Sequence, residues 1–251
     1  MKFAHLADTH LGYRQFGLIE RENDCYEVFE KIIDKIIEEE VDFVIHSGDL
    51  FETARPTPKA LLNFQKGLLK LRGAGIPMYA IAGNHDVVMR QGSIPPHVIF
   101  KKLGLKVISK INPTYMVGDI LIAGIQYHPS SHDKVLKSKL SELSKKAANH
   151  EKSILVLHQG IDKYFSPQYE LEIGDIPDNF NYYALGHIHK YVNEDFGNGK
   201  LVYPGSTEIW RSNEVSDYRK NGKGFVIVDM DGPKPVVKRV KVDIQREFID
   251  R

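Results

Sequence analysis

Two histidines end an apolar run near residue 185. In "YYALGHIHK", residues 182–190, His187 and His189 stand two positions apart. In an extended chain, side chains at this spacing point to the same side, with Cα atoms roughly 6.5–7 Å apart. The pair could hold one metal ion, supply one ligand each to two neighbouring ions, or be two ordinary surface histidines. The other chemistry-bearing residues must decide between these interpretations.

Four other predicted strands lead into residues of the same kind. Apolar residues predict strands over 2–7, 42–46, 78–82 and 153–157, and ligands of α/β sheets collect at the carboxyl ends of strands. With the histidine pair, the candidate metal ligands are Asp8, His10, Asp49, Asn84, His158, His187 and His189. Glycine precedes three of these groups, where the backbone must pass close to something. Helix caps or turns could explain one such ending, but a metal site explains all five better.

Alternating periodicities predict how these strand ends are positioned. Apolar residues recurring at i, i+4 predict an amphipathic helix over about 21–40, and 58–71 and 131–148 also read as helices. Strand–helix–strand alternation predicts largely parallel pairing in the first hundred residues. Further strands are predicted over 120–126, 182–185, 201–203, 225–228 and 236–242, and "EDFGNGKLVY" predicts a hairpin. We predict one α/β domain of two packed sheets with helices outside, and a long loop over 205–224.

Composition excludes several classes of protein. The 251 residues carry 34 basic and 33 acidic side chains, so any nucleic-acid binding must come from local patches. No apolar run approaches the roughly 20 residues of a membrane span, and "MKFAHLADTH" does not read as a signal peptide. We therefore expect a cytoplasmic protein without membrane contact, nucleoid-associated if prokaryotic. The single cysteine, Cys25, excludes an internal disulfide and thiolate metal clusters.

The order of the motifs resembles a known superfamily. "HLADTHLGY", "GDLF", "AGNHD", "LHQG", "YYALGHIHK" and "YPGS" resemble the calcineurin-like metallophosphoesterases. Within them, the strings are similar to the meiotic-recombination-eleven, or SbcD-type, nuclease subunit of DNA double-strand-break repair. The resemblance implies a four-layer αββα sandwich of two mixed sheets. It implies a nuclease core over 1–242, followed over 243–251 by the start of a truncated capping-domain segment.

The resemblance also implies an activity and partners. The implied activity is that of a manganese-dependent exonuclease on duplex DNA ends that is also a single-strand endonuclease. The implied assembly is a homodimer that binds an SbcC-type coiled-coil ATPase through a segment expected to lie beyond this sequence. Two alternatives use the same fold. The metal pair could serve a phosphatase or phosphodiesterase of small substrates, or the chain could be a non-catalytic scaffold. Hydrolysis of a nitrophenyl diester without DNA cleavage would favour the first, and failure to bind two Mn²⁺ the second.

Each candidate ligand receives a role from the resemblance. Asp8, His10, Asp49 and His189 would hold one ion, and Asp49, Asn84, His158 and His187 the other, so Asp49 bridges. Mn²⁺ is the expected metal, with Mg²⁺, Fe²⁺ or Zn²⁺ as possible substitutes, and mixed oxygen and imidazole ligands suit such ions better than Ca²⁺ or Cu⁺. The excess positive charge over two carboxylates would attract a phosphodiester and make hydroxide available near neutral pH.

The remaining histidines are divided between catalysis and structure. His85 is the candidate general acid, with Asp86 orienting its ring, although His85 could instead be a ligand or a structural contact. Glu52 stands where the nuclease family usually has histidine, and a carboxylate there would repel a phosphate unless protonated or turned away. We predict core positions for His5 and His46. Surface or loop positions are predicted for His97, His128, His132 and His150.

Two further sets of residues are candidates for contacts outside the metal site. Candidates for phosphate or base contact, each also readable as a solvated surface residue, are Tyr13, Arg14, Arg55, Lys59, Arg90 and Tyr169. Apolar residues on both sides of the segments 58–71 and 97–103 indicate full burial or a partner. The resemblance favours a two-fold dimer through Leu62, Leu69, Ile99 and Leu103.

Overall fold

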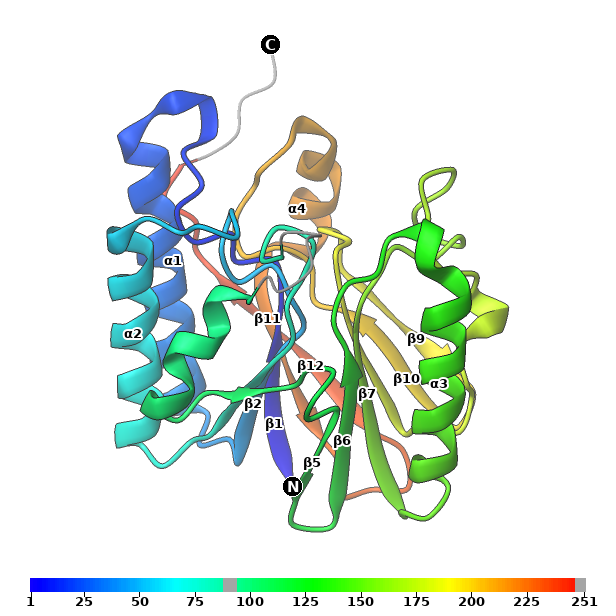
Figure 1. Ribbon diagram of the computed structural model, residues 1–251. Coiled ribbons are helices and arrows are strands. Elements are labelled where there is room, and N and C mark those ends of the chain that lie inside the picture. Colours follow the sequence, from blue (N-terminus) through cyan, green and yellow to red (C-terminus); the bar gives the residue numbers. More distant parts are fainter. Residues whose placement is uncertain (88–93, 247–251) are drawn as a thin grey trace.

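Two six-stranded sheets pack face to face in this protein (Figure 1). A computed structural model describes residues 1–87 and 94–246. The strand orders are β12-β11-β1-β2-β3-β4 and β5-β6-β7-β8-β10-β9. Helices α1 and α2 lie outside the first sheet and α3 lies outside the second (Figure 1). The predicted four-layer αββα arrangement of two mixed sheets is confirmed.

The first sheet combines a parallel half with an antiparallel edge. Its strands are β1 (Lys2–Leu6), β2 (Phe43–His46), β3 (Met78–Ala80), β4 (Lys106–Val107), β11 (Lys223–Asp229) and β12 (Val236–Val242). Strands β1 to β3 are parallel, as predicted, because α1 (Ile19–Glu38) and α2 (Pro58–Gly73) supply crossovers. The short strand β4, which was not predicted, also pairs in parallel with β3. The α2 helix begins after Thr57, whose hydroxyl accepts the Ala60 N–H.

The second sheet repeats this plan. Its strands are β5 (Thr114–Val117), β6 (Ile120–Ile125), β7 (Lys152–His158), β8 (Tyr182–Gly186), β9 (Val192–Phe196) and β10 (Gly199–Tyr203). Strands β6, β7, β8 and β10 are parallel, with α3 (Asp133–Ala147) joining β6 to β7. Strands β9 and β10 form the predicted antiparallel hairpin. The carboxyl ends of parallel strands from both sheets therefore lie at one end of the sandwich (Figure 1).

Aromatic residues fill the space between the two sheets. Phe3 stacks on Phe43 with ring centroids 4.9 Å apart, and Tyr182 meets Phe3 edge-on at 5.2 Å. His5 is fully buried there, its Nδ1 2.9 Å from the Tyr182 hydroxyl and its Nε2 2.8 Å from Ser47 Oγ. Such close packing is what makes the sheet ends a rigid support.

Several predictions of local structure were wrong. The predicted loop over 205–224 contains a 3-10 helix at Ser212–Glu214 and helix α4 (Val215–Asn221), because Glu214 and Val215 turn into the core. His97 is buried within the 3-10 helix Pro96–Leu103, neither on the surface nor in a loop. His128 is also buried, but it lies in a loop as predicted. His97 Nε2 lies 3.7 Å from Asp86 Oδ2. Other 3-10 helices are at Gln15–Gly17, Pro96–Leu103, Ser130–His132 and Ile173–Asp175.

The residues predicted for self-association lie on or near the surface. Leu62 and Leu69 on α2 are 56% and 42% exposed, and Ile99 on the 3-10 helix Pro96–Leu103 is 59% exposed. Leu103 is half-buried against the core under α1 and α2. No helix within residues 1–87 and 94–246 is long and apolar enough to cross a membrane.

Candidate metal centre

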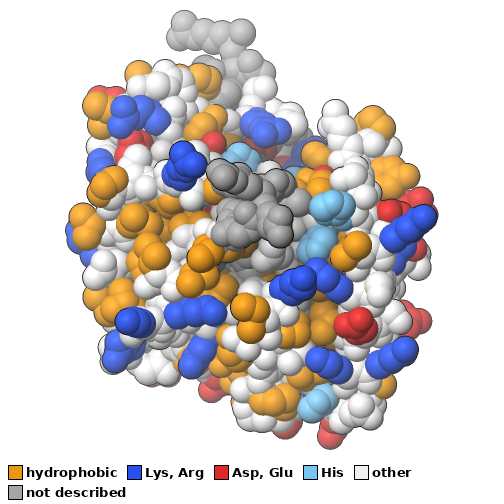
Figure 2. Space-filling view, in the orientation of Figure 1, with side chains coloured by type: hydrophobic (Ala, Val, Ile, Leu, Met, Phe, Trp, Pro, Cys, Tyr) orange, Lys and Arg blue, Asp and Glu red, His pale blue; other side chains and the backbone are white. Residues whose placement is uncertain are grey.

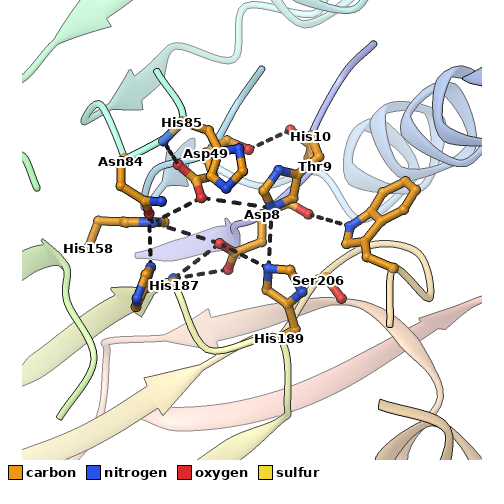
Figure 3. Close-up of polar contacts among 12 residues, drawn as sticks. Asp8, Thr9, His10, Asp49, Asn84, His85, His158, His187, His189 and Ser206 are labelled. Carbon is orange, nitrogen blue, oxygen red and sulfur yellow. Dashed lines mark hydrogen bonds and ion pairs between the residues drawn. The ribbon is translucent and has the colours of Figure 1, made fainter. Parts of the chain in front are cut away.

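The predicted ligands meet at the carboxyl ends of β1, β2, β3, β7 and β8 (Figure 3). Their donor atoms form two groups, within each of which the atoms lie within 4.8 Å of one another. The first cluster is Asp8, His10 and His189. The second cluster is Asp49, His158 and His187. Figure 3 shows Asn84 beside the second cluster.

The backbone at these residues is unusual. Among the described residues, six that are not glycine have positive φ. Four of them belong to the clusters: Asp8 (52°), His10 (44°), Asp49 (54°) and His187 (89°). Left-handed backbone is rare for such residues and is stabilised only where the surroundings impose it. Here the Asp8 N–H donates to the Gly48 carbonyl at 3.0 Å, which ties the ends of β1 and β2 together.

Glycines give the clusters room. A Cβ on Gly48 would stand 2.3 Å from His158 Nδ1, and one on Gly83 would stand 2.1 Å from Asp49 Oδ1. A Cβ on Gly186 would stand 2.2 Å from the Ser47 carbonyl oxygen. The predicted close approaches at these three glycines are confirmed, because any side chain would displace a cluster residue or the backbone behind it.

In the first cluster, each histidine has a carboxylate behind it. His10 Nε2 and His189 Nε2 face each other at 3.2 Å, and His189 Nε2 is 4.0 Å from Asp8 Oδ1. On the far side of the rings, His10 Nδ1 lies 2.9 Å from Glu52 Oε2 and His189 Nδ1 lies 2.8 Å from Glu214 Oε1. When Nδ1–H donates a hydrogen bond to a carboxylate, Nε2 carries no proton and is the ring atom that can bind a metal ion. The carboxylate also makes Nε2 more basic.

Glu214 is itself anchored by a buried cation. Its Oε2 lies 2.6 Å from Lys223 Nζ and 3.0 Å from Ser206 Oγ, and both charged side chains are buried. Burial disfavours the carboxylate, but the hydrogen bond from His189 and the charge of Lys223 outweigh it and lower the pKa of Glu214 to about 2. Our sequence reasoning missed both residues, because an isolated glutamate in a predicted loop carries no signal.

In the second cluster, a backbone carbonyl stands behind His158, and an amide oxygen joins the donor atoms. His158 Nε2 lies 3.2 Å from Asp49 Oδ2 and 3.1 Å from Asn84 Oδ1, and His187 Nδ1 lies 2.9 Å from the same amide oxygen. His158 Nδ1 donates to the Ser47 carbonyl at 2.8 Å. The nearest carboxylate behind His187 is Glu170, whose Oε1 is 3.6 Å from Nε2.

Charge in the pocket fits divalent cations. Burial, opposed by the nearby His158, raises the pKa of Asp8 to about 6. Burial acts on Asp49 in the same direction, but His158 outweighs it and holds the pKa of that carboxyl below its usual range. Two buried carboxylates converging with imidazole and amide donors form a favourable site only when positive charge compensates them. Oxygen and nitrogen donors without sulfur suit Mn²⁺, Fe²⁺ or Zn²⁺.

The histidine pair behaves differently from the extended strand that we expected. Strand β8 ends at Gly186, and His187 adopts a left-handed backbone, so the two side chains do not project from one strand face. They face different clusters, His189 the first and His187 the second. The extended-strand premise was wrong, whereas one of the arrangements that it allowed, a ligand each for two neighbouring sites, is the one that the geometry fits.

Asp86 does not orient His85, so that prediction was wrong. The Asp86 carboxylate accepts the N–H groups of Leu50 and Phe51 at 3.1 and 2.9 Å and thus holds the "GDLF" segment. His85 Nδ1 instead donates to the backbone carbonyl of Glu52 at 2.9 Å. The His85 N–H donates to Asp49 Oδ1 at 2.9 Å, so the residue still adjoins the second cluster.

The Glu52 side chain is turned toward His10. A third group of possible metal-binding atoms, His10, Glu52 and His85, lies within 4.8 Å. Because His10 Nδ1 and Glu52 Oε2 are already hydrogen-bonded, this group is better explained as support for His10 than as a third metal site. The carboxylate is directed at His10 Nδ1, and it also lines a small cavity with His85 and Arg211.

The predicted DNA-contact residues are dispersed. Tyr13 joins His10 and His85 around a small cavity and packs against Trp210 with ring centroids 5.2 Å apart. Arg14 and Lys59 are exposed and have partners of their own: Arg14 pairs with Glu22 at 2.6 Å, and Lys59 with Asn23 at 2.6 Å. Arg55 and Tyr169 lie on the surface, and Arg90 lies outside the described residues.

Arg211 is a candidate that our sequence reasoning missed. It is exposed and lines a cavity of about 150 Å³ together with Asp49, Asn84 and His85. A guanidinium at the mouth of such a cavity suits a phosphate oxygen. The residue lies in the segment predicted as a loop, and only its position in space marks it.

Comparisons with known proteins agree with this geometry. The family described as calcineurin-like phosphoesterase matches residues 1–191. The chain is 44% identical to the DNA double-strand break repair protein Mre11 of Methanocaldococcus jannaschii, over 100% of this chain and 69% of that protein. It is 37% identical to the protein of the same name from Saccharolobus solfataricus, over 99% of this chain and 65% of that protein.

Solved structures share the fold at low identity. TT1561 of Thermus thermophilus superposes with a TM-score of 0.60 at 14% identity, over 95% of this chain and 98% of that one. A dimetal phosphatase from Danio rerio superposes with a TM-score of 0.58 at 11% identity, over 96% of this chain and 97% of that one. At these identities the likeness concerns the arrangement of strands and helices.

Proposed function

This chain belongs to the calcineurin-like phosphoesterases, in the family of the archaeal Mre11 repair proteins, and on that premise we propose that it is a two-metal nuclease of DNA double-strand break repair. The observation that carries the proposal is the convergence of two donor clusters at the ends of parallel strands from both sheets. Exonuclease action on duplex ends and endonuclease action on single strands are the activities that we assign to it.

The two clusters would each hold one ion. Asp8, His10, Asp49 and His189 are the proposed ligands of the first ion, and Asp49, Asn84, His158 and His187 those of the second. We propose Mn²⁺, and the donor set is also compatible with Mg²⁺, Fe²⁺ or Zn²⁺. When bound, such a pair supplies the Lewis acidity that makes hydroxide available near neutral pH and stabilises charge on the phosphoryl group.

Protein side chains would position the substrate and move the proton. Arg211, at the cavity mouth, would pair with a phosphate oxygen. His85 is 31% exposed at the same cavity, and the Glu52 carbonyl holds its Nδ1. When both ring nitrogens carry a proton, Nε2 is the atom that would donate one to the leaving oxygen, which makes His85 the proposed general acid.

Digestion of end-labelled duplex and single-stranded DNA with Mn²⁺ tests this function. Asp49→Ala should abolish cleavage and reduce Mn²⁺ binding, measured by calorimetry. His85→Ala should bind two Mn²⁺ as the wild type does and lose about 10²–10⁴-fold in cleavage rate. Hydrolysis of bis(p-nitrophenyl) phosphate without cleavage of either DNA would instead support an enzyme of small substrates. Failure of the wild type to bind two Mn²⁺ would leave a non-catalytic scaffold.

We also propose that the protein forms a two-fold dimer. Leu62, Leu69 and Ile99 expose apolar side chains on two neighbouring helices, which touch through Phe64 and Phe100 at a centroid distance of 4.7 Å. Leu62→Asp should give a monomer by light scattering. Leu18→Asp, at a comparably exposed leucine before α1, should leave the mass unchanged. An SbcC-type ATPase partner and a cytoplasmic location are proposals that rest on family membership.

A further inference from the structure

A large cavity of this protein lies away from both clusters. It is a groove of about 760 Å³ between α3, the end of β6 and the segment that joins β4 to β5. Four lysines line it, and we call it the lysine groove: Lys110, Lys134, Lys139 and Lys146. Figure 2 shows blue Lys and Arg side chains above and below the pale-blue histidines on this face of the molecule.

The positive charge of the groove is only partly neutralised by the protein. Within residues 1–87 and 94–246, none of the four lysines forms an ion pair. Glu142 is the one carboxylate among the lining residues. By contrast Lys137, on the same helix but outside the groove, pairs with Asp175 at 3.0 Å. Four ammonium groups and one carboxylate leave a net positive charge around the cavity, which favours an anion.

One of these lysines is held in place. His128 Nδ1 donates to the Gln126 carbonyl at 2.8 Å, so its Nε2 must accept, and Lys139 Nζ donates to it at 2.8 Å. Burial and the charge of Lys110 lower the pKa of Lys139. The ammonium group is therefore fixed beside a second positive charge with a neutral partner, an arrangement that a bound anion would stabilise.

The floor of the groove is apolar. Val135 is 49% exposed beside Pro113 and the buried side chains of Ile125 and Leu143. An inorganic anion gains nothing from contact with such a surface, whereas the bases and sugars of an unpaired strand can pack against it. In a duplex the bases are stacked inside, so a lysine rim over an apolar floor favours a single strand.

Tyr127 links the groove to the metal centre along the chain, because its neighbours Gln126 and His128 line the groove. Tyr127 precedes His128, and its ring lies 5.9 Å from the His187 ring and 6.3 Å from the His158 ring. The Tyr127 N–H donates to the Ala82 carbonyl at 3.0 Å, which fixes this position against the loop that carries Asn84. A strand whose phosphate lies at the second cluster could thus continue past Tyr127 into the groove.

We propose that the lysine groove binds the backbone of single-stranded DNA next to the scissile phosphate. This inference rests on the proposed nuclease function and deepens it, because it assigns the path of one strand away from the metal pair. Lysines would contact successive phosphates, and the apolar floor would take a base or sugar.

A pair of charge-matched variants tests the proposal. Lys139→Gln/Lys146→Gln removes two charges from the groove, and Lys137→Gln/Lys145→Gln removes two from the same helix outside it. Fluorescein-labelled oligodeoxythymidylates of about 4 and about 12 nucleotides are titrated against each protein in EDTA, with fluorescence anisotropy as the readout. Circular dichroism confirms that all the proteins are folded.

The groove variant should bind the longer strand about tenfold more weakly than the wild type, and its salt slope should fall by about 1.4. Binding of the shorter strand, and all binding by the matched variant, should stay within about twofold. Equal weakening in both variants, or none in the groove variant, would overturn the proposal. Cleavage of the same strands with Mn²⁺ separates the two proposals. If binding depends on the groove but the wild type does not cleave, the proposed nuclease function is refuted and the proposed binding site is retained.

Discussion

The two clusters look alike in their first layer of donors and differ in what stands behind them. In the first cluster, Glu52 and Glu214 accept hydrogen bonds from His10 and His189 at 2.9 and 2.8 Å. In the second, His158 donates to a backbone carbonyl, and Glu170 stays 3.6 Å from His187. A carboxylate behind an imidazole strengthens it as a ligand. We therefore expect the first cluster to bind its ion more tightly than the second.

The largest effect should come from removing the cation that anchors Glu214. Lys223→Met would leave a buried carboxylate without its ion-pair partner, which costs about 3–5 kcal/mol of folding free energy. Denaturant unfolding measures it. Lys200→Met, which breaks the partly exposed pair with Asp195, should change stability by less than about 1 kcal/mol. Similar losses of stability in the two variants would mean that the buried pair of Glu214 and Lys223 stabilises the fold no more than a surface pair does. The buried carboxylate would then not set the first cluster apart from the second.

Removing the carboxylates themselves should weaken one ion selectively. Glu214→Gln should lower the affinity of one Mn²⁺ by about 10–100-fold and spare the other, measured by calorimetry. Glu52→Gln should act on the same ion by about tenfold or less, because Glu52 is 24% exposed whereas Glu214 is buried. If the two substitutions weakened different ions, the assignment of His10 and His189 to one cluster would be wrong.

Acid should erase the contribution of Glu214 to stability. The pKa of Glu214 is lowered to about 2 from an ordinary value of 4.5. The ionised carboxylate therefore stabilises the folded state fully above pH 4.5, and this stabilisation is lost as the pH falls toward 2. In EDTA, the stability difference between wild type and Glu214→Gln should be full at pH 7 and shrink below pH 4.5. A difference that grew on acidification would show that the folded-state pKa is raised instead.

The smallest effect should come from the second cluster. Glu170→Gln should change Mn²⁺ affinity by no more than about twofold, because the 3.6 Å separation from His187 Nε2 is too long for a hydrogen bond. A tenfold loss would show that Glu170 approaches His187 in solution and that the two clusters are supported in the same way.

Local motifs explain why the ligand positions were predictable. Asp8, Asp49 and Asn84 lie in the short segments just after apolar strands that end at Leu6, His46 and Ala80. Parallel strands bring their carboxyl ends to one edge. The supporting groups gave no such signal, because Glu214 and Lys223 reach His189 through tertiary contacts alone. His97 was misassigned for the same reason, because no neighbouring residue in the sequence indicates that His97 is buried against Asp86. Periodicity reports faces of elements and says little about which loops fold inward.

The anchoring of His189 by residues later in the chain bears on where a working unit can be cut. All seven proposed ligands fall within residues 1–191, the stretch that the family match covers. Glu214, which fixes the His189 ring, and Lys223, the first residue of the strand beside β1, come after it. A fragment that stopped at residue 191 would keep every ligand. It would lose Glu214, which orients His189, and also strand β11, which pairs with β1. Divisions drawn from sequence similarity alone would therefore produce a polypeptide unable to assemble its own centre.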